Sequence, residues 1–163
     1  MRLATCHRCV RAQPYPRLPG FAPHFRIFCL ASAGRERQDQ AFIISELALH
    51  VTTMLAALDR LEAHGYAFGP RTVTLLATDA RAAVAERVAT ALPGAVTRGV
   101  LEHPYYDGGL RYQIGVVGPD GTVLPLIDGG AFEWVAALTS NARLVYLASG
   151  MGAQLAATVF KVR

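Results

Sequence analysis

The sequence predicts an α+β domain in which a largely antiparallel sheet is backed by helices. Strand-forming segments alternate with helical ones in the order β-α-β-α-ββ-α-β-α, and two of the strands flank Gly118-Pro-Asp-Gly121, a strong hairpin turn signal. The 163 residues are 52% hydrophobic and 17% charged, which suits one globular domain over 1–163 rather than a disordered chain.

The first predicted elements are a strand over 25–31, after a Pro-rich loop over 14–23, and a long helix over 41–64. The apolar positions of the helix recur at steps of three and four, and they are Ile44, Leu47, Val51, Met54, Leu55, Leu58 and Leu61. Gly65 suits the end of this helix. Glu46 and His50, four residues apart on it, could share a metal ion, but a solvated pair is the favoured expectation.

The second half of the chain continues the alternation. A strand over 72–77 is followed by a helix over 80–92, which Asp79 can cap and which ends before Pro93-Gly94. The remaining elements are the hairpin strands over 110–117 and 122–127, a helix over 132–138, a strand over 144–148 and a helix over 152–160.

The charge of the chain is concentrated near its beginning. The net charge is +4, and residues 1–40 carry seven arginines against Glu36 and Asp39. Such a basic segment indicates an anionic partner such as phosphate or nucleic acid. The alternative is that arginine simply serves as the ordinary surface cation of this chain. The sequence contains a single lysine, Lys161, and this supports the alternative about as strongly as the anionic partner.

The sequence predicts a cytoplasmic protein that contacts no membrane. Glu46, His50, Asp59 and Arg60 interrupt the best apolar run, so no stretch of about 18 apolar residues remains. The first residues contain no apolar core of a secretory signal. In that compartment the three cysteines are expected to be reduced thiols.

A zinc site is the first chemical motif to consider. Cys6, Cys9, His24 and Cys29 follow a C-x2-C-x14-H-x4-C spacing that could surround one ion. Cys29, however, lies inside an apolar strand signal, where a cysteine usually serves as a small buried hydrophobe. The residues therefore favour a chain without metal ligands, with zinc kept as an alternative.

Three glycine-containing segments could each border a ligand. Ser149-Gly-Met-Gly152 follows a strand and opens a helix, but it lacks the rest of a dinucleotide fingerprint. Asp128-Gly-Gly130 ends a strand and allows close approach of a ligand or another backbone. In His103-Pro-Tyr-Tyr-Asp107, one tyrosine can pack while the other presents its hydroxyl. Each segment is also compatible with an ordinary turn.

Read in order, these motifs resemble the catalytic core of a class II aminoacyl-tRNA synthetase of the histidyl type, which the regulatory subunit of ATP phosphoribosyltransferase shares. The segment over 8–34, with Val10-Arg-Ala-Gln13 and Phe25-Arg-Ile-Phe28, is similar to motif 2 of that family. Pro104-Tyr-Tyr-Asp-Gly108 and Asp128-Gly-Gly-Ala-Phe-Glu133 resemble its Asp-Tyr-Tyr-Thr-Gly and Gly-Gly-Gly-Arg-Tyr-Asp signatures. The segment over 143–160 is similar to motif 3.

The resemblance implies a pocket on the sheet for a nucleotide and a second small molecule, with ATP and Mg²⁺ as the cofactors. It places Arg11 on the arginine that grips the ATP α-phosphate, with Arg26 and Phe28 also at the nucleotide. It assigns the ligand to Tyr105, Tyr106, Gly129, Gly130 and Gly150. No catalytic residue is assigned.

The departures from the family pattern concern charge. Gln154, Leu101 and Ala131 stand where the family has arginines, and Leu30 and Gly34 stand where it has a glutamine and a glutamate near the amino acid. Losing two such contacts at about 1.5–3 kcal/mol each would slow activation by orders of magnitude. Histidine activation is therefore not expected. The chain also has no room for an anticodon-binding domain or for motif 1, so it resembles a reduced or truncated paralogue.

Three functions follow as hypotheses. The leading one is a small-molecule-binding or regulatory module for a nucleotide or amino acid. The alternatives are an adenylate-forming ligase acting on another amino or carboxylic acid, and a zinc-stabilised module that binds tRNA or other nucleic acid. A homodimer or a partner subunit would cover the apolar helix over 41–64.

Overall fold

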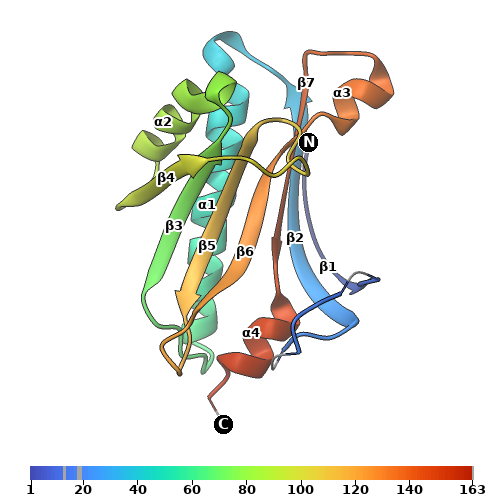
Figure 1. The fold of residues 1–163 in the computed structure, drawn as a ribbon. Coiled ribbons are helices and arrows are strands. Elements are labelled where there is room, and N and C mark those ends of the chain that lie inside the picture. The colour runs from blue at the N-terminus through green and yellow to red at the C-terminus, as the bar shows by residue number, and fades with distance from the viewer. Residues whose placement is uncertain (13, 18–19, 163) are drawn as a thin grey trace.

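A seven-stranded sheet forms the centre of the computed structural model, which describes residues 1–12, 14–17 and 20–162 (Figure 1). The strands are β1 Arg2–Val10, β2 His24–Arg35, β3 Arg71–Ala77, β4 Val96–Val100, β5 Leu110–Val117, β6 Val123–Phe132 and β7 Leu144–Met151. Their order in the sheet is β1-β2-β7-β6-β5-β3-β4, and only the β3–β4 pair is parallel. The expected α+β class is confirmed. Gln13, in the motif 2-like segment, lies outside the described residues, as do 18, 19 and 163.

Helices flank this sheet on one side and at its two ends (Figure 1). They are α1 Ala41–Glu62, α2 Ala82–Ala91, α3 Trp134–Thr139 and α4 Ala153–Val159, and short 3₁₀ turns over Gln38–Gln40 and Asp79–Arg81 precede α1 and α2. Figure 1 shows α1 running behind the sheet. We call the side that α1 packs against, which carries Tyr112, Leu147 and Ser149, the helical face. The other side, which carries Cys29, Asp128 and Gly150, is the open face.

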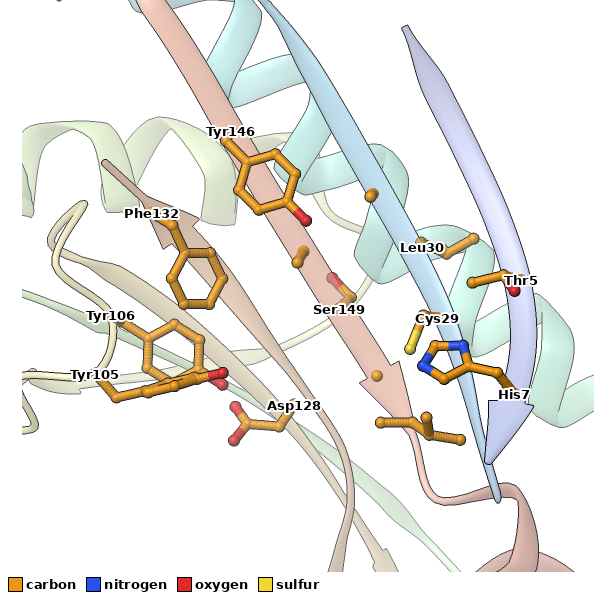
Figure 2. A pocket seen from close by; sticks show the side chains of 14 residues that line it. Thr5, His7, Cys29, Leu30, Tyr105, Tyr106, Asp128, Phe132, Tyr146 and Ser149 are labelled. Carbon is orange, nitrogen blue, oxygen red and sulfur yellow. The ribbon is translucent and has the colours of Figure 1, made fainter. Parts of the chain in front are cut away.

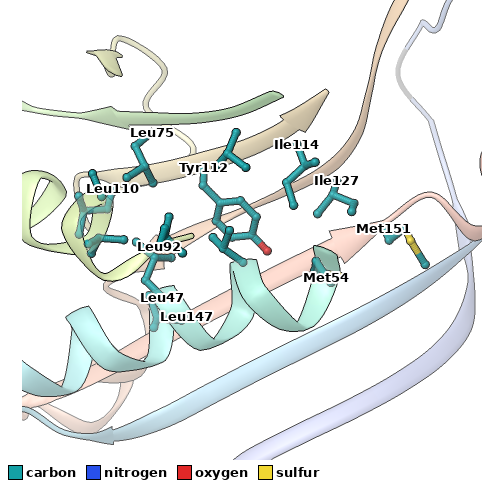
Figure 3. Close-up of a cluster of buried hydrophobic side chains, with 14 of the residues drawn as sticks. Leu47, Met54, Leu75, Leu92, Leu110, Tyr112, Ile114, Ile127, Leu147 and Met151 are labelled. Carbon is teal, nitrogen blue, oxygen red and sulfur yellow. The ribbon is translucent and has the colours of Figure 1, made fainter. Parts of the chain in front are cut away.

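The main core lies between α1, α2 and the helical face. Alternate residues of β5 enter it, so that Leu110, Tyr112 and Ile114 are almost completely buried. Leu47 of α1 and Leu147 of β7 lie next to each other in the same cluster (Figure 3). This alternation, one residue toward the core and the next toward the open face, decides where every candidate site residue of the sheet is found.

Glu46 and His50 correct the sequence-based expectation of a solvated pair. Both are only 3% exposed, because they lie on the side of α1 that faces the sheet. There they join a polar group with Ser32 of β2, Ser149 of β7 and Arg2 of β1. The buried stripe of α1 is therefore partly polar, and its polar members are hydrogen-bonded as burial requires.

The helix α1 also bears on the question of a membrane. By length and composition alone, residues Gln38–Glu62 could cross a bilayer. In the described structure, however, Leu47, Val51, Met54 and Leu58 of this helix belong to the protein core. A core helix passes the same test of length and composition, so this finding is weak evidence for a membrane span.

Two strands, β1 and β4, were not predicted from the residue pattern. They are the two edges of the sheet, and most of their residues are exposed on both sides. The apolar alternation that marks a half-buried strand is therefore missing from them. β2 is also longer than expected, because it reaches Arg35 beside β7.

Candidate functional site on the open face

A hollow of about 450 Å³ lies on the open face, across β1, β2, β7 and β6. The loop between β4 and β5, which contains Tyr105 and Tyr106, closes one side of it (Figure 2). The floor is made of small residues, since Ala31, Ala148 and Gly150 face this side of β2 and β7. A hollow of this size suits a drug-sized small molecule.

Gly150 keeps the floor low. A Cβ at this position would lie 2.5 Å from Cδ1 of Ile27 on the neighbouring strand. The absence of a side chain thus lets Ile27 pack across β7, and Gly150 stands directly opposite Asp128 of β6. The sequence-based expectation of a close approach at this glycine agrees with its surroundings.

Aromatic rings form one wall of the hollow. Tyr105 stands edge-on to Tyr106, with the ring centroids 5.1 Å apart, and edge-on to Phe132 at 5.4 Å. The ring centroid of Trp134 lies 4.3 Å from that of Phe132 and 5.9 Å from that of Tyr146. Tyr105 is 55% exposed whereas Tyr106 is 7% exposed, so one tyrosine packs and the other is presented, as the sequence predicted. Such a wall favours planar or cationic groups.

The charge inside the hollow is already neutralised. Arg111 of β5 donates two hydrogen bonds to Asp128, from Nε to Oδ1 at 3.0 Å and from Nη2 to Oδ2 at 2.8 Å. The same guanidinium lies 5.1 Å from the centroid of the Tyr106 ring. Burial first, and the Asp128 carboxylate second, raise the pKa of Tyr106, so its hydroxyl stays protonated and can donate.

Arg11 lies in an adjoining hollow of about 200 Å³, which shares Ile27 with the first. Its guanidinium carbon lies 4.5 Å from the ring centroid of Phe25, 5.9 Å from that of Tyr15 and 6.0 Å from that of Phe21. It forms no ion pair within the described chain. Arg11 is therefore a cation held by aromatic faces, close to the floor of the main hollow.

The predicted site residues divide between the two faces. Tyr105, Tyr106 and Gly150 line the main hollow and Arg11 lines its neighbour, while Gly130 belongs to the same face but is covered by the Tyr106 ring. Arg26, Phe28 and Gly129 are on strand positions of the other parity. Phe28 packs against the core, and a Cβ on Gly129 would meet Ser149 and Tyr112 of the helical face.

The same alternation bears on two positions that the resemblance placed near an amino acid. Gly34 faces α1, where a Cβ would lie 2.6 Å from the Phe42 ring, and Leu30 packs against the core. Leu30 also borders the hollow, beside Ile27, Cys29 and Ala31 of the same strand. Of the two positions, only Gly34 is therefore placed away from the hollow.

Leu101 and Ala131, which stand where the family has arginines, are built into the protein interior. Leu101 is 7% exposed and packs with Tyr106 and Phe132, and Ala131 is 2% exposed against Gly108. A cation at either position would need space that these side chains fill. The buried, apolar surroundings of both positions therefore suit a leucine and an alanine rather than the arginines of the family pattern.

Some residues at the hollow were not singled out from the sequence. Among them, Tyr146 of β7 and His7 of β1 line it, and Arg111 of β5 pairs with the lining residue Asp128. Arg111 and the buried Tyr112 are neighbours in the sequence, and strand alternation places them on opposite faces of the sheet. Only the register with β6 brings Arg111 beside Asp128. No signal local to these residues indicates that they converge.

The zinc alternative finds no support in the geometry. Cys6 and Cys9 are an odd number of residues apart on one strand, so they face opposite sides of the sheet. Among the described residues, no three of the types His, Cys, Asp and Glu are grouped so as to hold a metal ion. Burial raises the pKa of the Cys29 thiol, which keeps it protonated.

Comparison with known proteins places the fold. No model of a known protein family matches this chain, and no curated protein sequence does. Among solved structures, histidyl-tRNA synthetase from S. aureus is similar with a TM-score of 0.62 and 12% identity, over 92% of this chain and 41% of that one. The RNA-binding domain of threonyl-tRNA synthetase from Cryptosporidium parvum Iowa II is similar with a TM-score of 0.70 and 13% identity, over 95% and 42%.

These likenesses confirm the expected class II synthetase-like fold. The chain spans about two fifths of the length of each of these two proteins. At 12% and 13% identity the likeness concerns the fold alone.

Proposed function

We propose that this class II synthetase-like chain is a small-molecule-binding or regulatory module, which takes a nucleoside-like or amino-acid-like ligand and does not activate histidine. One observation carries the proposal: the hollow on the open face has an aromatic wall, and its carboxylate, Asp128, is neutralised by Arg111. Such a site recognises a ligand by ring contacts and tyrosine hydroxyls rather than by strong net charge.

ATP and Mg²⁺ fit this site poorly. No arginine is among the described residues that line the main hollow, and the adjoining hollow offers two, Arg11 and Arg26, whereas a triphosphate carries several charges. Mg²⁺ beside a nucleotide is usually held by one or two protein carboxylates, and the one carboxylate among the described residues that line the hollow, Asp128, is paired with Arg111. Adenylate formation therefore supplies no step of the proposed function, and a nucleotide ligand would bind through its base and sugar.

Calorimetric titration with histidine, the other amino acids, adenosine and ATP tests the proposal. Ala148→Leu would fill the floor between Tyr146 and Gly150, so it should abolish binding of the ligand that the wild type takes. Ala56→Leu, on an exposed position of α1, is the matched control. If no compound in the panel binds, or if Ala148→Leu binds as tightly as the control, the proposal is wrong.

A second candidate function, an adenylate-forming ligase for another amino or carboxylic acid, rests on Arg11. Its guanidinium is held by three aromatic rings beside the main hollow, where it could contact one phosphate. Pyrophosphate exchange across a panel of acids separates the two candidates. Exchange that falls sharply in Arg11→Ala would favour the ligase, and no exchange across the panel would favour the binding module.

We propose a homodimer or a partner subunit as a further part of this function. The edge strand β1 is exposed along most of its length, and Leu3 on it is 56% exposed. Leu49 on the adjacent part of α1 is 36% exposed and lines a groove with Leu3. Sedimentation at micromolar concentration tests this, since a purely monomeric protein without a co-purifying partner would contradict it.

A further inference from the structure

The arginines of the sheet differ in how their charge is balanced. Arg2, Arg71, Arg98 and Arg111 each form an ion pair with a carboxylate. Arg8 of β1 and Arg26 of β2 form none within the described chain, and they stand directly opposite each other in the register of the two strands. Like charges opposite each other on one face of a sheet destabilise the pairing.

Both guanidinium groups border a third hollow, of about 330 Å³, at the end of the sheet where β1 stops and α4 begins. His24, Phe25 and Gln154 complete its lining. Arg26 has the same strand parity as Phe28, which packs into the core, and neither Arg8 nor Arg26 lines the main hollow. Arg26 also borders the adjoining hollow that contains Arg11. Cys29 and Ile27, on the alternate positions, belong to that main hollow.

No acidic residue is among the described residues that line this hollow. Residues 1–30 contain no aspartate or glutamate at all, and they contain five arginines. The lining offers two guanidinium groups that can only donate, and His24 and Gln154 can each donate a further hydrogen bond to an anion. An anion between the two guanidinium groups would turn the repulsion between them into two favourable pairings.

We infer that Arg8 and Arg26, with His24 and Gln154 beside them, form a binding site for a phosphate group. A guanidinium presents its N–H groups in a planar fork that matches two phosphate oxygens, and two forks facing each other can hold one tetrahedral dianion. The site is separate from the hollow of the proposed function. Its phosphate could belong to a small phosphorylated molecule or to a nucleic-acid backbone.

The experiment measures binding of inorganic phosphate by calorimetry at constant ionic strength. We expect the double variant Arg8→Gln/Arg26→Gln to bind phosphate at least about tenfold more weakly than the wild type. The matched control is Arg35→Gln, which removes an exposed arginine without an ion-pair partner at the other end of β2. The control should bind phosphate within about twofold of the wild type.

Two further measurements keep the result unambiguous. Without phosphate, the double variant should unfold at the same temperature as the wild type or higher, because the repulsion has been removed. Ala148→Leu, which blocks the main hollow, should leave phosphate binding unchanged, so the two sites can fail separately. The inference is overturned if the wild type does not bind phosphate, if the double variant binds it as the wild type does, or if Arg35→Gln loses it equally.

Competition then identifies the source of the phosphate. A nucleoside monophosphate and a short single-stranded RNA are each titrated into the phosphate-bound protein. Displacement by the RNA with an affinity that falls steeply with salt supports the site and assigns it to a nucleic-acid backbone. Displacement by the monophosphate alone supports the site and assigns it to a small molecule.

Discussion

Ser149 Oγ lies 2.8 Å from Nδ1 of His50, although 99 residues separate them in the chain, and this contact fixes the protonation of the histidine. Ser32 donates its single hydroxyl proton to Glu46, so toward His50 Nε2 it can only accept. Nε2 therefore carries the ring proton, and Nδ1 accepts from Ser149. The hydrogen bonds run in one direction from Ser149 to Glu46, which Arg2 holds from the edge strand.

This chain of hydrogen bonds ties four segments together on the helical face. Arg2 belongs to β1, Ser32 to β2, Ser149 to β7, and Glu46 and His50 to α1. Ser149 follows Ala148 and precedes Gly150, the floor of the main hollow. The buried network thus holds β7 from the helical face, and the main hollow lies on the open face of the same strand.

The network predicts that stability falls as the solution becomes acidic. Burial lowers the pKa of His50 to about 4 from 6.5, against the opposing effect of Glu46. The unfolded chain then binds more protons than the folded one between these values, so the free energy of unfolding decreases as the pH falls from 6.5 toward 4. Between pH 7 and pH 5 the loss is about 2 kcal/mol from this group.

Urea unfolding at pH 7 and pH 5 measures that difference. His50→Asn removes the titrating ring, so its loss between the two pH values should be smaller than that of the wild type by about the same amount. His64→Asn, on an exposed position after α1, should keep the wild-type loss. Equal pH dependence in wild type and His50→Asn would show that folding does not lower the pKa of the His50 ring.

A pair of glycine substitutions tests the two faces of the site. A Cβ on Gly129 would lie 2.3 Å from Ser149 Oγ and 2.7 Å from Tyr112 Cε1, both fixed within the core. We expect Gly129→Ala to lower the free energy of unfolding by about 1–3 kcal/mol through overpacking. Gly150→Ala meets only the end of Ile27, a side chain that can change rotamer, and should cost less than about 1 kcal/mol.

Thermal and urea unfolding of the two variants give this comparison directly. Gly150→Ala should also weaken ligand binding, because the new methyl group rises into the floor of the hollow. A greater destabilisation by Gly150→Ala than by Gly129→Ala would mean that the assignment of faces is reversed.

The sequence predicted those parts of the molecule whose signal is local. The apolar spacing of the helix over 41–64 and the turn at Gly118-Pro-Asp-Gly121 both survive in the structure, as α1 and the β5–β6 connection. The edge strands gave no such signal, since β1 and β4 bury little on either side. Burial of Glu46 and His50 could not be predicted either, because their partners lie on three different strands.

The candidate site shows the same limit. Tyr105, Tyr106 and Gly150 were found because a motif marks each of them. Successive residues of β2 point to opposite faces of the sheet. A shift of one residue along the strand therefore exchanges the residues that face the hollow for those that face the core. The pairing of Asp128 with Arg111 depends on a cross-strand register that no composition or spacing determines.

A charge substitution at Asp128 tests whether the hollow is kept neutral by its ion pair. In Asp128→Asn the Arg111 guanidinium loses its carboxylate and remains on the open face. We expect the affinity for ATP or pyrophosphate to rise by about tenfold, since a charged hydrogen bond contributes roughly 1.5–3 kcal/mol. Asp120→Asn, on the exposed turn before β6, is the control and should leave that affinity unchanged.

Alkylation of the cysteines reports whether the hollow is open in solution. Cys6 is exposed on the edge strand, whereas Cys29 is half-buried and lines the hollow. Because burial raises the pKa of the Cys29 thiol, it has less reactive thiolate, so at pH 7.5 we expect Cys6 to react with iodoacetamide several times faster.

The informative comparison is between the wild type and Ala148→Leu, followed by mass spectrometry of each cysteine. The leucine should occupy space beside Cys29, so alkylation of Cys29 should slow further while alkylation of Cys6 stays constant. Cys6 then serves as the internal control for folding and reagent activity. If Cys29 reacts at the same rate in both proteins, the reagent does not reach Cys29 through this hollow, which contradicts the prediction.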